Sequence, residues 1–352
     1  MPNEAEGRKV ALAAFLAVLF YRLQDDKCRA ARQRLSRETV RDGSGAMFEL
    51  VAPRYDFVNN VISLGLHRGW KRTAVDAALE PFLVASSERA ELQVLDLATG
   101  TADLAIDIAQ RYGSYVKQVV AVDPCSRMLD IASRKLARAQ VSDKVLLVKG
   151  VAEELPQEWT NRFDVCIIGF GVRNFADRKK GLCEVWRVLK KAEASTATPT
   201  DPVSRLVVLE ITEPRGRSIA APIARFFLRT CVPLLGALFS LRLREYCYLQ
   251  RSARLFPPLD EFLEAMRDEC CLETIRAQRL PPFGLGPALI IAKPAPKQAS
   301  VEAAALAPED AFVNSSATPS RSSTDAPWHV ESAPRNDERD ASGVAPPSSV
   351  VA

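Results

Sequence analysis

The sequence predicts an α/β fold in which a mainly parallel sheet is covered by helices on both faces. Two observations lead to this prediction. Apolar residues recur at helical spacing, as at Met128, Ala132 and Leu136. These helical patterns lie between short β-rich runs at 93–97, 118–123, 145–148, 163–168, 205–210 and 288–293. Strands that alternate with helices form βαβ units, and such sheets bind ligands beyond the carboxyl ends of their strands.

Before this region, residues 1–44 form an N-terminal extension that holds a short apolar segment. Residues 10–21 are twelve consecutive apolar residues behind Arg8 and Lys9. A helix needs about 20 apolar residues to span a membrane, so this segment is too short for a comfortable span. We expect a targeting segment or a membrane anchor here, with an additional helix as the alternative.

The turn after the first β-rich run carries the features of a ligand site. The run ends in Val94-Leu-Asp-Leu-Ala-Thr-Gly-Thr-Ala-Asp103, which places Asp96 and Asp103 close to Gly100. Glycine lets the backbone turn tightly and lets a ligand approach it closely. The next run closes with Asp123, about 20 residues beyond the turn, where α/β nucleotide-binding proteins hold ribose hydroxyls with an acidic side chain.

The charge of this turn favours a cationic ligand. A dinucleotide site needs the pattern G-x-G-x-x-G, whereas Thr99 and Ala102 stand here where glycines would be. The carboxylates around the turn would repel a pyrophosphate but attract a cation. S-adenosylmethionine carries a sulfonium, an ammonium and a ribose, so it fits this pattern. The residues alone leave a dinucleotide site and a plain structural turn as alternatives.

Composition argues against several other kinds of site. The chain has 47 Lys and Arg against 43 Asp and Glu, and a net charge of +4 is too small to indicate nucleic-acid binding. Its eight cysteines form no C-x-x-C pair, so we expect no metal site, and inert thiols in a reducing compartment. Of the two histidines, His329 lies in the C-terminal tail, so His67 is the one that the fold can use.

Three irregular segments follow in the second half of the chain. Residues 192–204 are expected to be a loop inserted after a helix that has Asp177 as its N-cap. Residues 219–255 are both apolar and rich in arginine. Residues 297–352 are rich in Ala, Ser, Pro, Asp and Glu and bury too little apolar surface to fold. This leaves one folded domain over 45–296, followed by a disordered tail.

Two long segments and three shorter ones carry a family resemblance. The first is Met47-Phe-Glu-Leu-Val-Ala-Pro-Arg-Tyr-Asp56 with the following Asn59-Asn-Val-Ile-Ser-Leu-Gly-Leu-His-Arg-Gly-Trp-Lys71. The second is Phe170-Gly-Val-Arg-Asn-Phe-Ala-Asp177, and the shorter ones lie at 185–190, 206–210 and 246–252. In this order, over roughly 45–294, the segments resemble the ubiquinone/menaquinone biosynthesis C-methyltransferases.

The resemblance implies a class I methyltransferase fold, a Rossmann-like sheet of seven strands that binds S-adenosylmethionine. The expected cofactor-binding residues follow or end the first four strands: Asp96, Gly100, Thr101, Asp123, Val151, Ala152 and Gly169. Three positions depart from the family. Ala102 replaces a common Gly, Val151 replaces a polar Asn or Asp, and Gly169 replaces a common Ser.

The reaction that the resemblance implies is methylation of a ring carbon in a polyprenylated quinol. The ring is more nucleophilic as its phenolate, so a base near the hydroxyl and a cation for the oxyanion are expected. The candidates are Tyr55, Asp56, His67, Asp103 and Arg173. Arg173 suits the oxyanion because guanidinium stays charged, and Asp103 or His67 suits the proton acceptor. Each of three candidates also has a structural role as its alternative. Arg173 could tie a loop to a carboxylate, Tyr55 could pack in the core, and His67 could be a buried histidine whose hydrogen bonds are made within the fold.

We therefore expect an S-adenosylmethionine-dependent C-methyltransferase that acts on 2-polyprenyl-6-methoxy-1,4-benzoquinol or demethylmenaquinol in ubiquinone or menaquinone biosynthesis. The alternatives are a weakly active or inactive member that serves as a partner in a quinone-synthesis complex, and a Rossmann oxidoreductase.

The expected partners follow from the same resemblance. Residues 219–255 are either core helices or a cap that admits a polyprenyl tail from a membrane surface. Besides the quinol and the membrane, a second copy of the chain or a quinone-synthesis complex is a candidate partner, and nucleic acid is not. We expect a peripheral membrane protein, on the matrix side of the mitochondrial inner membrane in a eukaryote or the cytoplasmic side of the inner membrane in a bacterium.

Overall fold

The structure is a computed structural model, and it describes residues 46–85, 91–191, 204–212, 222, 225–232, 251–282 and 286–296. The expectations for the N-terminal extension, for nearly all of the inserted loop and for the C-terminal tail lie outside the described residues. Most of the apolar and arginine-rich stretch over 219–255 lies outside them too.

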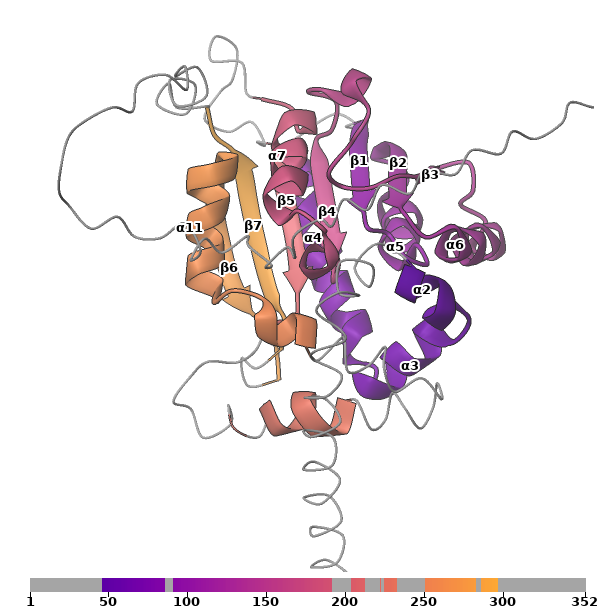
Figure 1. Cartoon of the computed structure of the whole chain (residues 1–352). Coiled ribbons are helices and arrows are strands. Elements are labelled where there is room, and N and C mark those ends of the chain that lie inside the picture. The colour runs from indigo at the N-terminus through magenta and orange to yellow at the C-terminus, as the bar shows by residue number, and fades with distance from the viewer. Residues whose placement is uncertain are drawn as a thin grey trace, which may run out of the picture.

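A seven-stranded sheet forms the centre of the described fold (Figure 1). Its strands are β1 (Leu92–Leu97), β2 (Val116–Asp123), β3 (Val145–Lys149), β4 (Val165–Gly169), β5 (Arg205–Glu210), β6 (Leu272–Arg279) and β7 (Ala288–Pro294). They are ordered β3-β2-β1-β4-β5-β7-β6 across the sheet. Strands β1 to β5 pair in parallel, and β7 is antiparallel to both of its neighbours. The prediction of a mainly parallel sheet is confirmed.

Strand β6 is the one described strand that was not predicted, because none of the β-rich runs of the sequence covers it. It lies at the edge of the sheet, paired on one side with β7. Glu273, Ile275 and Arg276 are exposed there, so polar residues interrupt the apolar run that marks the inner strands. An edge strand has no need of two apolar faces, which is why hydrophobic patterning alone does not reveal it.

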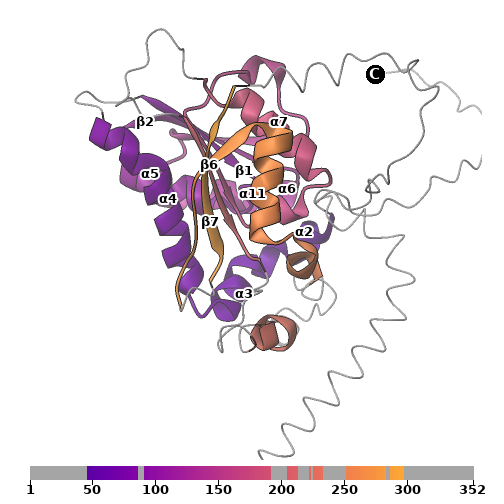
Figure 2. The same cartoon turned by 90° about the vertical axis from the view of Figure 1, so that its left-hand side faces the viewer.

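Helices cover both faces of the sheet, as predicted. The first face is covered by α4 (Leu66–Ala85), α5 (Asp103–Tyr112) and α6 (Ser126–Ala139), and the second by α7 (Arg178–Val188) and α11 (Leu259–Cys270). Figure 2 shows α4 and α11 on opposite sides of the sheet. The predicted N-cap of α7 is also confirmed, because Asp177 accepts the backbone N–H of Lys180 at 2.9 Å.

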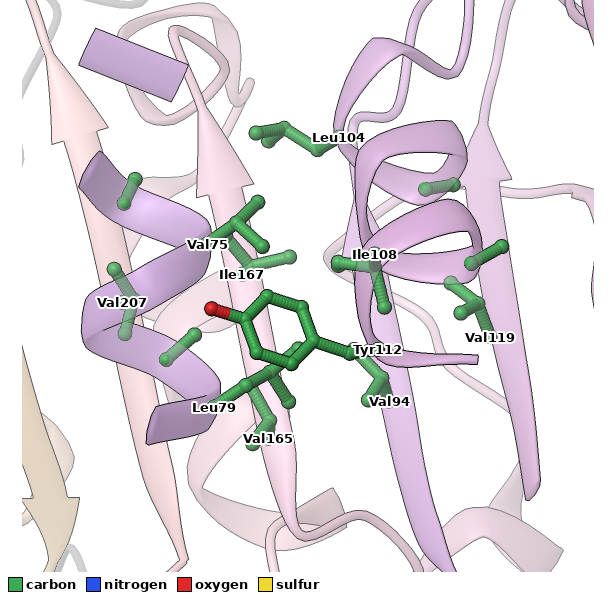
Figure 3. Packing of buried hydrophobic residues seen from close by; sticks show 14 of the residues in the cluster. Val75, Leu79, Val94, Leu104, Ile108, Tyr112, Val119, Val165, Ile167 and Val207 are labelled. Atoms are coloured by element: carbon green, nitrogen blue, oxygen red, sulfur yellow. The ribbon is translucent and has the colours of Figure 1, made fainter. Parts of the chain in front are cut away.

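Each face of the sheet has its own hydrophobic core, because successive strand residues point to opposite faces. The cluster under α4 and α5 includes Val75, Leu79, Val94, Ile108, Ile167 and Val207 (Figure 3). The cluster under α7 and α11 includes Leu95, Ile168, Leu182, Val208 and Phe262. Burying each of these side chains contributes about 1.5–3 kcal/mol, so the two cores fix the strand ends in place.

Short helices gather at the carboxyl ends of the parallel strands. Before α4 lie α2 (Ala46–Val51), the 3-10 helix η1 (Ala52–Arg54) and α3 (Tyr55–Ile62). Figure 1 shows α2 and α3 beyond the ends toward which the β4 and β5 arrows point. Further along the chain, the 3-10 helix η3 (Val172–Asn174) follows β4, and the π-helix η4 (Phe227–Cys231) comes after β5. The 3-10 helix η2 (Gln157–Trp159) lies instead near the amino ends of the strands, where the following Arg162 donates to Gln93 at the start of β1.

Part of the apolar and arginine-rich stretch covers α3. Val58 and Ile62 of α3 are buried against Val232, which follows η4, with Phe227 of η4 packed beside them. Contact with the N-terminal helices therefore brings residues of 219–255 to the edge of the sheet where a ligand is expected. Within the described ranges, no helix is long and apolar enough to cross a membrane.

Candidate active site

The turn between β1 and α5 leaves open space against its backbone. Gly100 has a φ of +58°, in the left-handed region that glycine adopts without strain. A Cβ built on Gly100 would meet no atom within 4 Å. Ala98 and Ala102 share this region, with φ of +58° and +64°, although it costs an alanine about 1–2 kcal/mol. A ligand therefore has room to approach the backbone at Gly100.

Asp123 ends β2 directly beside this turn. One carboxylate oxygen accepts the backbone N–H of Gly100 at 2.8 Å, and the other accepts that of Cys125 at 2.9 Å. Burial raises the pKa of Asp123, although both hydrogen bonds oppose the shift. A carboxylate offers about four acceptor positions, so each oxygen can still accept one hydroxyl proton. This capacity fits the paired hydroxyls of a ribose.

Asp96 lies fully buried under the same turn. Its Oδ2 accepts the Thr99 hydroxyl at 2.6 Å and the backbone N–H of Ala105 at 3.1 Å. Its Oδ1 has no hydrogen-bond partner among the described residues, and burial raises the pKa of Asp96 to about 7. A buried acceptor without a donor is the kind of group that a cationic ligand satisfies. Asp96, Gly100 and Asp123 together fit S-adenosylmethionine.

The remaining predicted cofactor residues line the same edge of the sheet. Val151 follows β3 with 42% of its surface exposed, and Ala152 beside it is buried. A Cβ on Gly169, at the end of β4, would stand 2.7 Å from the Cδ1 atom of Leu104. Gly169 therefore leaves the space that the side chain of Leu104, in the first turn of α5, occupies.

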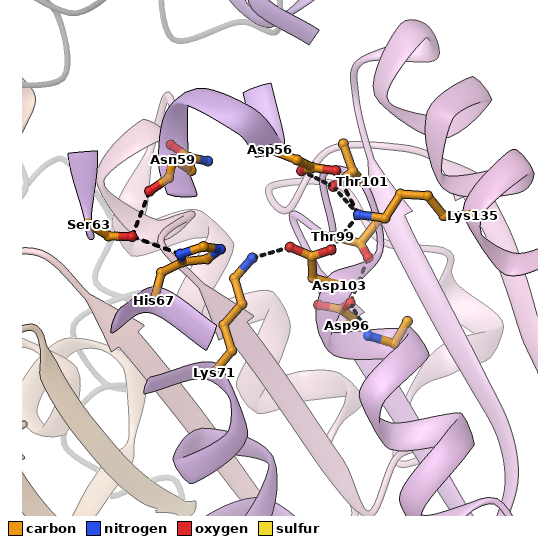
Figure 4. Close-up of polar contacts among 11 residues, drawn as sticks. Asp56, Asn59, Ser63, His67, Lys71, Asp96, Thr99, Thr101, Asp103 and Lys135 are labelled. Carbon is orange, nitrogen blue, oxygen red and sulfur yellow. Dashed lines mark hydrogen bonds and ion pairs between the residues drawn. The ribbon is translucent and has the colours of Figure 1, made fainter. Parts of the chain in front are cut away.

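Four charged side chains and one hydroxyl form a polar cluster above the turn (Figure 4). Asp103 receives the Lys71 ammonium at 2.6 Å and also pairs with Lys135. Lys135 reaches Asp56 at 2.8 Å and the Thr101 hydroxyl at 3.0 Å, and Thr101 donates to Asp56 at 2.7 Å. The cluster joins α3, α4, α5 and α6 at one point.

The charges of this cluster balance one another. Burial on its own would raise the pKa of Asp103, but the Lys71 and Lys135 ammonium groups outweigh it and hold that pKa well below its usual range. Burial would likewise lower the pKa of Lys71, but the Asp103 carboxylate raises it. The net negative charge that the sequence suggests around this turn is thus partly cancelled. Asp103 is also a weak proton acceptor in this setting.

His67 lies in the first turn of α4 and is held by Ser63. Leu64 and Gly65 both have positive φ, and this bend between α3 and α4 brings Ser63 to within 2.7 Å of the His67 Nδ1. The Ser63 hydroxyl donates its single proton to the Asn59 carbonyl at 2.6 Å, so Ser63 must accept from the His67 Nδ1–H. The Nε2 lone pair of His67 is then available to accept a proton.

The surroundings of His67 keep the imidazole neutral. Only 9% of the residue is exposed, and burial and the nearby Lys71 charge lower its pKa. Figure 4 shows the His67 ring on the side of the cluster where Lys71 reaches toward Asp103. A neutral imidazole with an unprotonated Nε2 is the protonation state that a general base needs.

Arg173, in η3, lies in a separate buried network. Its guanidinium pairs with Glu210 at the end of β5 and donates to the Phe170 carbonyl at 2.9 Å. The two side chains of the pair are 6% and 0% exposed. The structure thus contains the loop-to-carboxylate tie that the sequence analysis gave as the alternative for Arg173, and a catalytic role stays a prediction.

Tyr55 begins α3 beside the polar cluster. Its ring packs edge-to-face against Phe48, with centroids 6.3 Å apart, in the small core between α2 and α6. Of the predicted residues, His67 and Asp103 lie beside Lys71 (Figure 4).

Sequence reasoning missed the two lysines and the serine of this site. Lys71 closes the first family segment, so a signal for it was present. Lys135 lies on the polar side of α6 and carries no such signal, and the role of Ser63 depends on the bend before α4. No group of three metal-ligating side chains occurs among the described residues.

Comparison with known proteins gives one family. The model of the ubiE/COQ5 methyltransferase family matches residues 35–284. A demethylmenaquinone methyltransferase from Lactiplantibacillus plantarum is 35% identical over 233 residues, which are 66% of this chain and 89% of that protein. The ubiquinone/menaquinone biosynthesis C-methyltransferase UbiE from Geobacter sulfurreducens is 35% identical over 247 residues, which are 70% of this chain and 86% of that protein.

Among solved structures, a SAM-dependent methyltransferase from Aquifex aeolicus is 15% identical with a TM-score of 0.39, and the match covers 61% of this chain and 89% of that one. The family model spans more than half of the chain and reaches from the polar cluster through β6. The chain therefore belongs to the ubiE/COQ5 methyltransferase family, the S-adenosylmethionine-dependent methyltransferases of quinone biosynthesis.

Proposed function

We propose that this chain methylates a ring carbon of a polyprenylated quinol, either 2-polyprenyl-6-methoxy-1,4-benzoquinol or demethylmenaquinol. The names of its relatives support both substrates, since some are demethylmenaquinone methyltransferases and others serve ubiquinone as well. The observation that carries the proposal is the geometry at the carboxyl ends of the strands: the His67 Nδ1 is 2.7 Å from the Ser63 hydroxyl, and Lys71 beside it pairs with Asp103.

The chemistry of the reaction assigns a role to each of these groups. Bound S-adenosylmethionine supplies the electrophilic methyl group. His67 Nε2 accepts the proton of the quinol hydroxyl, which raises the electron density of the ring. Lys71 stabilises the phenolate oxygen, and Asp103 keeps Lys71 charged and in place. This assignment favours His67 over Asp103 as the proton acceptor.

Arg173 and Tyr55 contribute to the site from neighbouring elements. Arg173 holds the loop between β4 and η3 through Glu210 and Phe170. Tyr55 begins the helix that carries Asp56 of the polar cluster. Asp96, Gly100, Thr101, Asp123, Val151, Ala152 and Gly169 would hold the cofactor.

Complementation tests this function and separates the two substrates. The full chain is expressed in bacterial strains that lack the quinone C-methylation step, and the extracted quinones are analysed by mass spectrometry. We expect methylated ubiquinone, methylated menaquinone or both, according to the ring that the site accepts. If only demethylated precursors accumulate in every strain while the folded protein is present, the proposed activity is wrong.

A catalytically weak partner of a quinone-synthesis complex is the second candidate. The strained φ of Ala102, where relatives commonly have glycine, is the observation that favours it. Calorimetry with S-adenosylmethionine separates the two, because a partner without activity need not bind the cofactor. Binding in the micromolar range or tighter would argue against this candidate.

We further propose that the protein works at a membrane surface, on the matrix or cytoplasmic side of an inner membrane. Phe57, Leu64 and Leu66, around the bend between α3 and α4, are 56%, 75% and 44% exposed, and Arg54 and Arg68 nearby are exposed as well. Apolar side chains with basic neighbours suit an anionic lipid surface. The full chain should float with anionic vesicles and Leu64→Glu should float less. Equal flotation of the two proteins, or none, would contradict this placement.

A further inference from the structure

Two cysteines that lie far apart in the sequence meet between the helices of the second face. Cys183 is in α7 and Cys270 is the last residue of α11, 87 positions later. Their sulfur atoms are 3.4 Å apart. Helices α7 and α11 pack side by side on the face of the sheet opposite α4 (Figure 2), well away from the polar cluster. Sequence spacing gave no sign of this pair, and the thiols were expected to be inert.

The two thiols differ in their surroundings. Cys270 is 2% exposed within the core that includes Phe262, whereas Cys183 is partly exposed. Lys179, one helical turn before Cys183, pairs with Glu269 at 2.9 Å and so holds a positive charge beside the two sulfurs. The hydrogen bond with Cys270 and the Lys179 charge lower the pKa of Cys183, whereas burial and the carboxylates of Asp177 and Glu269 oppose this shift. The same hydrogen bond and burial raise the pKa of Cys270 well above its usual range, so Cys270 stays a thiol.

We propose that Cys183 and Cys270 are a redox-sensitive pair that closes a disulfide between α7 and α11. A disulfide bond is about 2.05 Å long, so the sulfurs need to approach by little more than 1 Å. The partly exposed Cys183 is the thiol that an oxidant reaches first, and the buried Cys270 is the thiol that resolves the product.

The reaction balances with hydrogen peroxide as the oxidant. The Cys183 thiolate attacks one peroxide oxygen, the O–O bond breaks, and a sulfenic acid and hydroxide form. The Cys270 sulfur then attacks the sulfenic sulfur, and its thiol proton leaves with the departing oxygen as water. The hydroxide takes up the proton that Cys183 released when it became a thiolate, so the two thiols lose two electrons and two protons in total and the peroxide is reduced to two molecules of water.

The disulfide would stabilise the fold around the cofactor side of the sheet. It closes a loop that contains β5 and the η4 segment, which packs against α3. Helix α7 also lies against the predicted cofactor site, because a Cβ on Gly181 would stand 3.3 Å from the Ala152 Cβ. Closing a long loop lowers the entropy of the unfolded chain, so the oxidised protein should unfold at a higher temperature.

Peptide mapping of the peroxide-treated full chain tests the pair. The protein is treated under native conditions, alkylated, digested without reductant and analysed by mass spectrometry. We expect a disulfide-linked peptide pair that contains Cys183 and Cys270, and a Tm higher by about 5 °C or more that returns to its starting value with dithiothreitol. The proposal would be overturned if the protein stays folded during the peroxide treatment and both thiols can still be alkylated after it is unfolded.

Matched variants separate this pair from the neighbouring thiol. Cys183→Ser should lose both the linked peptide and the Tm rise. Cys271→Ser removes the thiol next to Cys270 and should keep both. If Cys183→Ser does not fold, the peptide map of the unmodified chain still decides, because a link from Cys183 to any other cysteine contradicts the assignment.

Discussion

At the scale of single residues, Ser63 determines which nitrogen of His67 carries a proton. The hydroxyl of Ser63 has one proton, and the Asn59 carbonyl takes it at 2.6 Å, so His67 must donate from Nδ1. The Nε2 lone pair then faces the region of Lys71 and Asp103 (Figure 4). Ser63 is thus a positioning residue, and although it lies inside the first family segment, its role follows from the bend before α4.

Replacing Ser63 tests this role. Ser63→Ala frees both tautomers of His67, so we expect kcat to fall about ten-fold with KM for S-adenosylmethionine unchanged, and Ser63→Thr, which keeps the hydroxyl, to retain most activity. His67→Gln should lose about 100-fold or more. Steady-state kinetics with a quinol substrate measures all three variants.

The pH dependence of kcat is a second test of His67 as the general base. Protonation of His67 removes the base, and its pKa is lowered, so the rate should fall with decreasing pH only below the ordinary value of 6.5. This acidic limb should be missing in His67→Gln. An unchanged limb in that variant would mean that another group accepts the proton.

Asp96 gives the fold a pH dependence of its own. Its carboxyl titrates near 3.8 when unfolded and near 7 when folded, so between these values the folded state binds more protons. The contribution of Asp96 to the stability should therefore be largest at low pH and fall as the pH rises toward 7. Asp96→Asn lacks this titration. The difference between its free energy of unfolding and that of the unmodified protein should therefore shift by about 2–4 kcal/mol in favour of the variant when the pH is raised from about 5 to about 8. Urea unfolding measures the difference, and a constant difference across pH would contradict the assignment.

At the scale of elements, the ion pair of Arg173 and Glu210 joins η3 to the end of β5. Glu210 is fully buried, so Arg173→Ala leaves a buried carboxylate without its cation and should cost about 3–5 kcal/mol. Loss of activity in that variant would not by itself report on catalysis. The double variant Arg173→Met with Glu210→Gln removes both charges and should recover most of the stability.

Activity of the double variant then decides the role of Arg173. If its guanidinium stabilises the phenolate, kcat stays low after stability is restored, while cofactor binding is kept. Recovery of both stability and kcat would leave Arg173 with the structural tie alone. Urea unfolding, calorimetry and steady-state kinetics on the same preparations give the three quantities.

Elements that are patterned by local chemistry were predictable from the sequence. The inner strands are apolar runs, and Asp177 marks the start of α7 because an aspartate side chain can accept a free backbone N–H. The edge strand β6 was missed because only one of its eight residues is buried and three are exposed. The bend at Leu64 and Gly65, which separates α3 from α4, has no unambiguous signal in one sequence.

At the scale of the whole molecule, the parts of the site that escaped prediction are those that depend on tertiary contacts. Asp103 was visible as a carboxylate at a turn, but its partners Lys71 and Lys135 each lie 32 residues away. Only the packing of α4, α5 and α6 shows that this turn is charge-balanced. The position of Asp123 was predictable, because the end of a parallel strand next to a glycine turn defines the place of an acidic side chain.

Methyl transfer by the purified full chain tests directly whether the protein methylates a quinol that His67 deprotonates. The protein is incubated with S-adenosylmethionine and either demethylmenaquinol or 2-polyprenyl-6-methoxy-1,4-benzoquinol, each in its reduced and its oxidised form, and the products are analysed by mass spectrometry. The account predicts a ring-methylated product from at least one quinol and none from the oxidised quinones, which have no hydroxyl for His67 to deprotonate. Cofactor binding without methylation of either quinol, or equal methylation of the oxidised forms, would contradict it.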